Sequence, residues 1–201
     1  MNRYCRKLII PEDIMPTYDM SGMETKGYSW YQFHKELQES DFPKGFIEWM
    51  RSMNIYSEWM EIFYTPPNDV GYIHSDNTCH SDWSKIIFQV GAKGSTMRWY
   101  EAESKYKQRI STAITEYVDD AKDRVEDQYH GDVLVAEEKN CKLLHEVEIG
   151  DCSLANVGYL HNSYNPTNER RFVFTYAPND ITTRKRLLWD DAINRLSDYL
   201  V

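Results

Sequence analysis

Two histidines and one aspartate have the residue types and spacing of a metal site. His74 and Asp76 are separated by a single residue, and side chains two apart on a strand share a face. His161 lies much later in the chain. Two imidazoles and a carboxylate form the 2-His-1-carboxylate facial triad, which holds non-haem Fe(II) and leaves three positions open. The sequence therefore predicts one metal site on His74, Asp76 and His161.

An arginine follows the distal histidine after a turn. His161 precedes the turn residues Asn165 and Pro166, and Arg171 begins the apolar run after them. A hairpin centred on this turn would make His161 and Arg171 near neighbours across the strand ladder. A guanidinium suits bidentate capture of a carboxylate. Spacing favours Arg171 over the adjacent Arg170 as the anion anchor, and the sequence leaves open which of the two faces the site.

The elements that must position these residues are mostly short strands separated by turn residues. This pattern favours a sandwich or barrel. We expect a mainly β fold with flanking helices, a double-stranded β-helix of the jelly-roll or cupin-like kind, which brings an early strand beside a late one. Strands are predicted at 8–10, 58–64, 70–74, 85–90, 96–101, 132–137, 142–149, 153–157 and 171–177. Helices are predicted at 28–39, 46–53, 104–128 and 181–200.

The totals favour one domain and exclude some partners. A chain of 201 residues suits a single core, with 1–54 as N-terminal helical and loop support, 55–177 as the barrel with a helical insertion at 104–128, and 181–200 as a terminal helix. The net charge of -9 disfavours nucleic acid as a partner, because such binding depends on basic contacts to phosphate. Four cysteines without CxxC spacing and no bilayer-length apolar stretch predict a cytoplasmic protein that does not enter membranes. The oligomeric state is not indicated.

The combined pattern resembles the Fe(II)/2-oxoglutarate-dependent oxygenase superfamily. The motif His74-Ser75-Asp76, the distal His161 and the later Arg171 occupy the places of that superfamily's signature, and Gly150-Asp151 resembles its usual entry to the strand before the distal histidine. The resemblance covers about residues 60 to 177.

This resemblance implies a cofactor, a cosubstrate and a reaction. Fe(II) would be bound by His74, Asp76 and His161, and 2-oxoglutarate would chelate it with its far carboxylate on Arg171. O2 would then decarboxylate 2-oxoglutarate to succinate and hydroxylate a small molecule, an amino-acid side chain or a peptide. The hydroxyl residue that many members place two positions after the arginine is Val173 here. Another donor would have to assist, with the candidates being Tyr64, Tyr100 and Thr175.

Other interpretations remain open from the sequence. The chain could be a metal-binding cupin enzyme that does not use 2-oxoglutarate, or a non-enzymatic jelly-roll binding module. His80 is a further candidate ligand, which would give a three-histidine cupin site. Asn77 or Asn156 could support the ligand histidines. Aromatic side chains could line a substrate pocket, although packing is their commoner role, and the candidates are Trp83, Trp99 and Tyr100.

Overall fold

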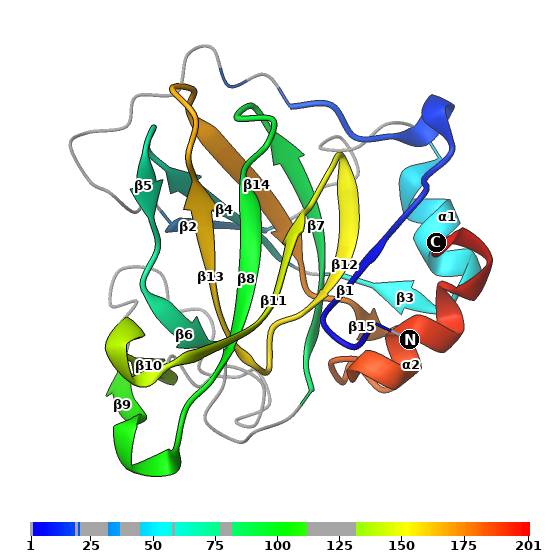
Figure 1. Ribbon diagram of the computed structural model, residues 1–201. Coiled ribbons are helices and arrows are strands. Elements are labelled where there is room, and N and C mark those ends of the chain that lie inside the picture. Colours follow the sequence, from blue (N-terminus) through cyan, green and yellow to red (C-terminus); the bar gives the residue numbers. More distant parts are fainter. Residues whose placement is uncertain are drawn as a thin grey trace.

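Two antiparallel sheets face each other in the computed structural model, which describes residues 2–18, 20, 32–36, 45–57, 59–76, 82–111 and 132–201 (Figure 1). The first, called here the β7 sheet, is six-stranded in the order β1-β12-β7-β14-β4-β2. Its strands are β1 (Cys5–Lys7), β2 (Gln32–Glu36), β4 (Trp59–Thr65), β7 (Ser84–Val90), β12 (Cys152–Asn156) and β14 (Arg171–Tyr176).

The second, called here the β8 sheet, is seven-stranded in the order β11-β8-β13-β6-β10-β9, with β5 also paired to β13. Its strands are β5 (Asp69–Val70), β6 (Ile73–Ser75), β8 (Thr96–Glu101), β9 (Gln108–Ser111), β10 (Asp132–Ala136), β11 (Lys142–Glu148) and β13 (Leu160–Asn165). A separate two-stranded ladder joins β3 (Ile55–Tyr56) to β15 (Asn179–Asp180).

The chain passes repeatedly between the two sheets. After β1, β2 and β4, which all belong to the β7 sheet, it crosses to β6, returns to β7, crosses to β8 and β11, and then alternates through β12, β13 and β14. This path makes the fold a double-stranded β-helix, or jelly roll. The predicted fold class is confirmed. Early strand β6 and late strand β13 lie side by side, with His161 opposite His74 in the ladder.

Strands β12 and β14 of the β7 sheet are buried on both faces. In β14, Phe172, Phe174 and Tyr176 belong to one hydrophobic cluster, whereas Val173 belongs to another between the sheets. This alternation follows from the two-residue period of a strand. Burying each large apolar side chain contributes about 1.5–3 kcal/mol, so the apolar residues on both faces of β14 stabilise the fold.

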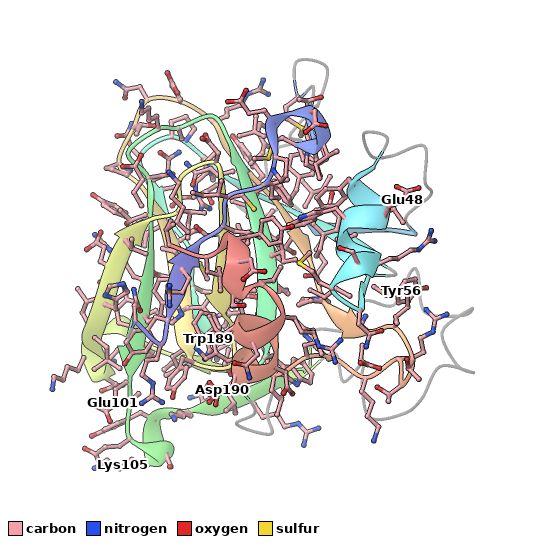
Figure 2. The ribbon with its side chains drawn as sticks, turned by 90° about the vertical axis from the view of Figure 1, so that its right-hand side faces the viewer. Glu48, Tyr56, Glu101, Lys105, Trp189 and Asp190 are labelled. Carbon is pink, nitrogen blue, oxygen red and sulfur yellow. The ribbon has the colours of Figure 1, made fainter. Side chains whose placement is uncertain are left out.

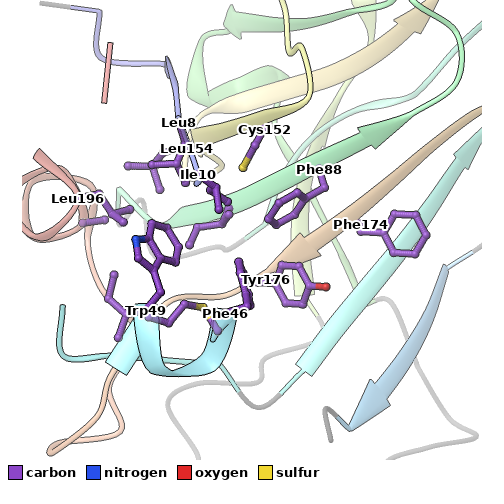
Figure 3. Packing of buried hydrophobic residues seen from close by; sticks show 14 of the residues in the cluster. Leu8, Ile10, Phe46, Trp49, Phe88, Cys152, Leu154, Phe174, Tyr176 and Leu196 are labelled. Carbon is purple, nitrogen blue, oxygen red and sulfur yellow. The ribbon is translucent and has the colours of Figure 1, made fainter. Parts of the chain in front are cut away.

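Two short helices cover the outer face of the β7 sheet. They are α1 (Phe46–Ser52) and α2 (Trp189–Arg195), which lie on the same side of the barrel and are turned toward the viewer in Figure 2. Phe46 and Trp49 of α1 point toward the strands that carry Phe88 and Tyr176 (Figure 3). The outer face of the β7 sheet thus packs on helices, whereas its inner face carries the polar residues Lys85, Arg171 and Thr175.

The predicted strands at 85–90, 96–101, 142–149 and 171–177 and the helix at 46–53 are confirmed within a residue or two. The helix predicted at 28–39 is wrong over residues 32–36, which form β2 along the edge of β4, and its other residues lie outside the described part of the chain. The insertion helix at 104–128 is wrong over its first part, where a 3-10 turn (Ser104–Tyr106) leads into β9, and 112–128 lies outside the described residues. The terminal helix is shorter than 181–200, and the strand expected at 8–10 is β1, a few residues earlier.

No helix in the described part of the chain is long and apolar enough to span a bilayer.

Candidate metal centre

Three predicted ligands meet at one point between the two sheets. His74 lies in β6, Asp76 directly follows it, and His161 lies in the paired strand β13. One donor atom from each residue lies within 4.8 Å of the others. Asp76 Oδ1 is 3.4 Å from His74 Nε2 and 3.7 Å from His161 Nε2. With metal–ligand bonds of about 2.0–2.2 Å, small side-chain rotations would bring all three onto one ion.

Backbone carbonyls fix the orientation of both imidazole rings. His74 Nδ1 donates to Tyr72 O at 3.1 Å, and His161 Nδ1 donates to Tyr159 O at 2.8 Å. A carbonyl only accepts hydrogen bonds, so each Nδ1 carries the proton and each Nε2 presents its lone pair toward Asp76. Such partners orient metal-ligating histidines. Of the two asparagines predicted for this role, Asn156 bonds instead to Arg3 O and the Gly158 N–H. Asn77 lies outside the described residues.

A buried lysine lies beside the aspartate. Lys85 Nζ is 2.6 Å from Asp76 Oδ2 and also forms a close ion pair with Glu61. Burial favours the neutral carboxyl, but the Lys85 ammonium and the contact with His74 outweigh it and hold the pKa of Asp76 well below its usual range. Asp76 is therefore an anion across the physiological pH range, as a metal ligand must be.

The distal histidine is held neutral by its surroundings. Burial, reinforced by His74, lowers the pKa of His161 to about 3. In the unfolded chain the same imidazole has a pKa of about 6.5. Between these two values the unfolded state binds a proton that the folded state does not bind, so stability falls as pH falls. His161 is thus ready to coordinate without first losing a proton.

This difference predicts an acid-sensitive metal-free protein. Lowering the pH from 6.5 to 5 is expected to cost the metal-free protein about 2 kcal/mol of unfolding free energy through His161 alone. Urea denaturation in the presence of a chelator, at a series of pH values, measures the effect. His161→Gln is expected to show a shallower dependence than the wild type over this window, because it removes the titrating group. Parallel pH dependences would show that His161 does not supply the effect.

Arg171 lies at the start of β14, buried with 3% of its surface exposed. Its Nε donates to Gln89 Oε1 at 3.2 Å and to Ser95 Oγ at 3.0 Å. Burial lowers the pKa of its guanidinium to about 10, so it remains charged at neutral pH. Among the described residues no carboxylate forms an ion pair with it. A buried cation without a counter-ion is costly, so the site is suited to receive an anion.

One cavity connects the triad to Arg171. Its volume is about 50 Å³, and it is lined by the three candidate ligands, by Lys85 and Arg171, and by Phe63, Ile87, Met97, Val157, Asn162, Ser163, Val173 and Thr175. Of the two adjacent arginines, Arg171 lines this cavity. Arg170 is exposed and places its guanidinium over the Phe172 ring. Gly91 permits this approach of β7 to β14, because a Cβ there would lie 2.4 Å from Arg170 O.

The prediction that His161 and Arg171 lie on paired strands of one hairpin is wrong. β13 pairs with β5, β6 and β8, whereas β14 pairs with β4 and β7. The two residues therefore lie on opposite sheets and line the same cavity from either side. The turn at Pro166 connects β13 in one sheet to β14 in the other. It is therefore a jelly-roll crossover and not a hairpin.

The two tyrosines predicted to hold the cosubstrate do not line the cavity. Tyr64 follows inward-facing Phe63, so strand alternation turns it outward, where it packs on Phe172 with ring centroids 5.2 Å apart. Tyr100 follows buried Trp99 and donates its hydroxyl to Asn162 Oδ1 at 3.2 Å. Thr175, the third candidate, does line the cavity.

The remaining predicted site residues have other positions. Trp99 is packed in the core between the sheets and donates its indole N–H to Asn156 O, so packing is its role. Trp83 lies under the Arg186 guanidinium. His80 lies outside the described residues. The sequence did not predict Lys85 as a site residue, because it begins the mostly apolar run 85–90 and its inward orientation appears only in the structure.

Comparisons with known proteins find similarity only at the level of structure. No protein-family pattern matches the sequence, and no curated protein matches it. Solved structures with similar folds include an oxalate oxidase in complex with the substrate analogue glycolate (14% identity, 72% of this chain and 50% of that chain, TM-score 0.31). EvdO2 from Micromonospora carbonacea var. aurantiaca (15% identity, 89% and 79%, TM-score 0.35) and E. coli ycfD (18% identity, 68% and 30%, TM-score 0.32) are two others.

The chain spans half the length of that oxalate oxidase. Similarity of this degree carries no information on cofactor or substrate. The case for a metal rests on the three donor atoms of His74, Asp76 and His161, which lie close enough together to share one ion.

Proposed function

We propose that the protein is an Fe(II)- and 2-oxoglutarate-dependent oxygenase that hydroxylates a small molecule or an amino-acid side chain. One observation carries this proposal: a buried guanidinium without a carboxylate partner among the described residues lines the same cavity as a two-histidine, one-carboxylate donor set. The donor set suits Fe(II), and the guanidinium suits the far carboxylate of a chelating dicarboxylate.

The charges of the cavity fit this pair of ligands. Asp76 and Glu61 are anionic, whereas Lys85 and Arg171 are cationic, so these four side chains sum to zero. A divalent cation together with a dianion leaves that sum unchanged. Ile87 and Val173 lie between the charged ends, where they would contact the methylene groups of the dicarboxylate. Apolar walls at this point also exclude water.

The chain's own residues would prepare the reaction in defined ways. His74, Asp76 and His161 would hold the ion by one face, with both imidazoles already turned by their carbonyl partners. Arg171, braced by Gln89 and Ser95, would fix the dicarboxylate by its far end. When bound, the Fe(II) supplies O2 activation coupled to oxidation of 2-oxoglutarate. Positioning and water exclusion are the protein's contribution.

Anaerobic binding followed by exposure to oxygen tests the proposal. Adding 2-oxoglutarate to the Fe(II)-loaded protein without oxygen is expected to give a visible charge-transfer absorption, because the keto acid chelates the ion. Admitting O2 with ascorbate is expected to release succinate, detected by NMR, at a slow rate without a hydroxylation substrate. Fe(II) binding without either signal would contradict the use of 2-oxoglutarate.

The small cavity favours a second candidate function. Its volume of about 50 Å³ holds about four waters at roughly 10–15 Å³ each. A five-carbon dicarboxylate would need side chains such as Met97 or Lys85 to move, whereas a two- or three-carbon anion would need less room. A metal-dependent jelly-roll enzyme that does not use 2-oxoglutarate would bind such a short anion on the metal and release no succinate.

A further inference from the structure

Lys85 is a buried cation placed in the candidate metal cavity by the β7 sheet. It is the second residue of β7, on the same inward face as Ile87, and only 7% of its side chain is exposed. Its ammonium contacts the carboxylates of Asp76, which follows β6 in the opposite sheet, and of Glu61 in β4, which is separated from β7 by β14 in the same sheet. A lysine at this position costs burial free energy that two anions offset.

The two oxygens of Asp76 have separate partners. Oδ1 lies 3.4 Å and 3.7 Å from the Nε2 atoms of His74 and His161, the two other donors of the proposed metal site. Oδ2 lies 2.6 Å from Lys85 Nζ. A carboxylate can coordinate through one oxygen or through both. Here the second oxygen is already engaged by the ammonium.

The ammonium is itself held from several sides. Glu61 pairs with it and also accepts from Thr175 Oγ1 at 3.1 Å, so the glutamate is fixed by β14. The Phe63 ring centroid is 5.3 Å from Lys85 Nζ. Lys85 therefore cannot turn away from Asp76 without also breaking its ion pair with Glu61.

We propose that Lys85 is a positioning residue that holds Asp76 to one-oxygen coordination and thereby keeps a metal position open for an anionic ligand. The inference rests on the proposed metal site, but it does not depend on which anion binds. Lys85 is the residue that makes Asp76 behave as one ligand instead of two. Without it, Oδ2 would be free to join the metal at a position that the anion needs.

Removing Lys85 should have opposite effects on the metal and on the anion. The loss of a positive charge beside the ion, together with a second carboxylate oxygen, favours the metal. The same second oxygen competes with a chelating anion. A residue that only supported the fold would instead weaken both kinds of binding together.

The test uses Co(II) as the metal probe and oxalate as the anion probe. In Lys85→Met, Co(II) is expected to bind severalfold more tightly, and oxalate is expected to bind to the Co(II)-loaded protein at least about tenfold more weakly. The visible absorption of bound Co(II) is expected to weaken in the oxalate-free variant, as its coordination number rises. Titration calorimetry and absorption spectra give these values.

Two further variants separate positioning from folding. Glu61→Gln combined with Lys85→Met removes both charges of the ion pair, and it is expected to keep the same opposite effects. Lys105→Met removes an exposed lysine paired with Glu103 and is expected to match the wild type. Unchanged oxalate binding in both Lys85 variants, or equal losses of Co(II) and oxalate binding, would overturn the inference.

The outcomes also distinguish this inference from the proposed function. Wild-type protein that binds no Co(II) would overturn both. Wild-type protein that binds Co(II) and oxalate, with Lys85 variants that behave like it, would overturn the role of Lys85 alone. Opposite effects in the Lys85 variants with no binding of 2-oxoglutarate to the Fe(II)-loaded wild type would support Lys85 and contradict the proposed cosubstrate.

Discussion

His161→Ala is expected to weaken Fe(II) binding by more than about a hundredfold, because even the loss of a residue that only orients a ligand costs about 10–100-fold. The variant keeps His74 and Asp76 but removes the nitrogen that lies 3.7 Å from the shared oxygen Asp76 Oδ1. Two ligands from one short segment cannot define a face of the ion by themselves. Anaerobic competition with a coloured chelator measures the change.

His145→Ala is the matched control for this substitution. His145 lies in β11, where its ring stacks on Tyr4 at a centroid distance of 5.5 Å and contacts Asn2 at 2.9 Å. It is not among the three residues that converge, so its loss is expected to leave Fe(II) affinity within about threefold of the wild type. Equal losses in the two variants would show that general destabilisation, and not ligand removal, explains the effect.

Arg171→Met is expected to weaken 2-oxoglutarate binding to the Fe(II)-loaded protein by about a hundredfold or more. Removing one partner of a buried, hydrogen-bonded charge pair costs about 2–5 kcal/mol, and each 1.4 kcal/mol is tenfold. Fe(II) affinity is expected to change little, since Arg171 bonds to Gln89 and Ser95 and not to a ligand residue. Titration of the charge-transfer absorption under anaerobic conditions measures the cosubstrate affinity.

The adjacent arginine provides the control. Arg170→Met removes the same charge one residue earlier, from an exposed position, and is expected to bind 2-oxoglutarate like the wild type. The ligand-free Arg171→Met protein is expected to unfold at or above the wild-type midpoint, because removing a buried charge without a counter-ion offsets the lost hydrogen bonds. A loss of 2-oxoglutarate affinity in Arg170→Met as large as in Arg171→Met would contradict a specific anchor on β14.

The strands and the convergence of the ligands could be predicted from the sequence because both follow from local rules. The apolar run that begins after Arg171 gives β14 directly, and the single-residue spacing of His74 and Asp76 places both on one side of a strand end. The jelly-roll connection then brings His161 beside His74. These steps need only periodicity and topology.

The predictions that the structure contradicts concern residues whose positions depend on contacts between distant segments. Residues 32–36 pair with β4 as an edge strand, so a partner strand overrides their weak helical pattern. Tyr64 and Tyr100 were predicted to hold the cosubstrate, but the sequence does not show which alternate residues of their strands face inward. Once Phe63 and Trp99 are placed between the sheets, both tyrosines must face outward.

Lys85 was not predicted because a lone lysine in an apolar run normally indicates an exposed or edge position. Its two carboxylate partners come from β4 and from the end of β6, and neither is close to it on the same strand. The charge balance of the site could therefore be assembled only in three dimensions.

Anaerobic titration calorimetry of the wild-type protein with Fe(II) tests the central claim most directly, that His74, Asp76 and His161 share one ion. One ion per chain is expected, with binding abolished when all three are replaced in His74→Ala/Asp76→Asn/His161→Ala. No Fe(II) binding by the wild type, or undiminished binding by the triple variant, would contradict the account.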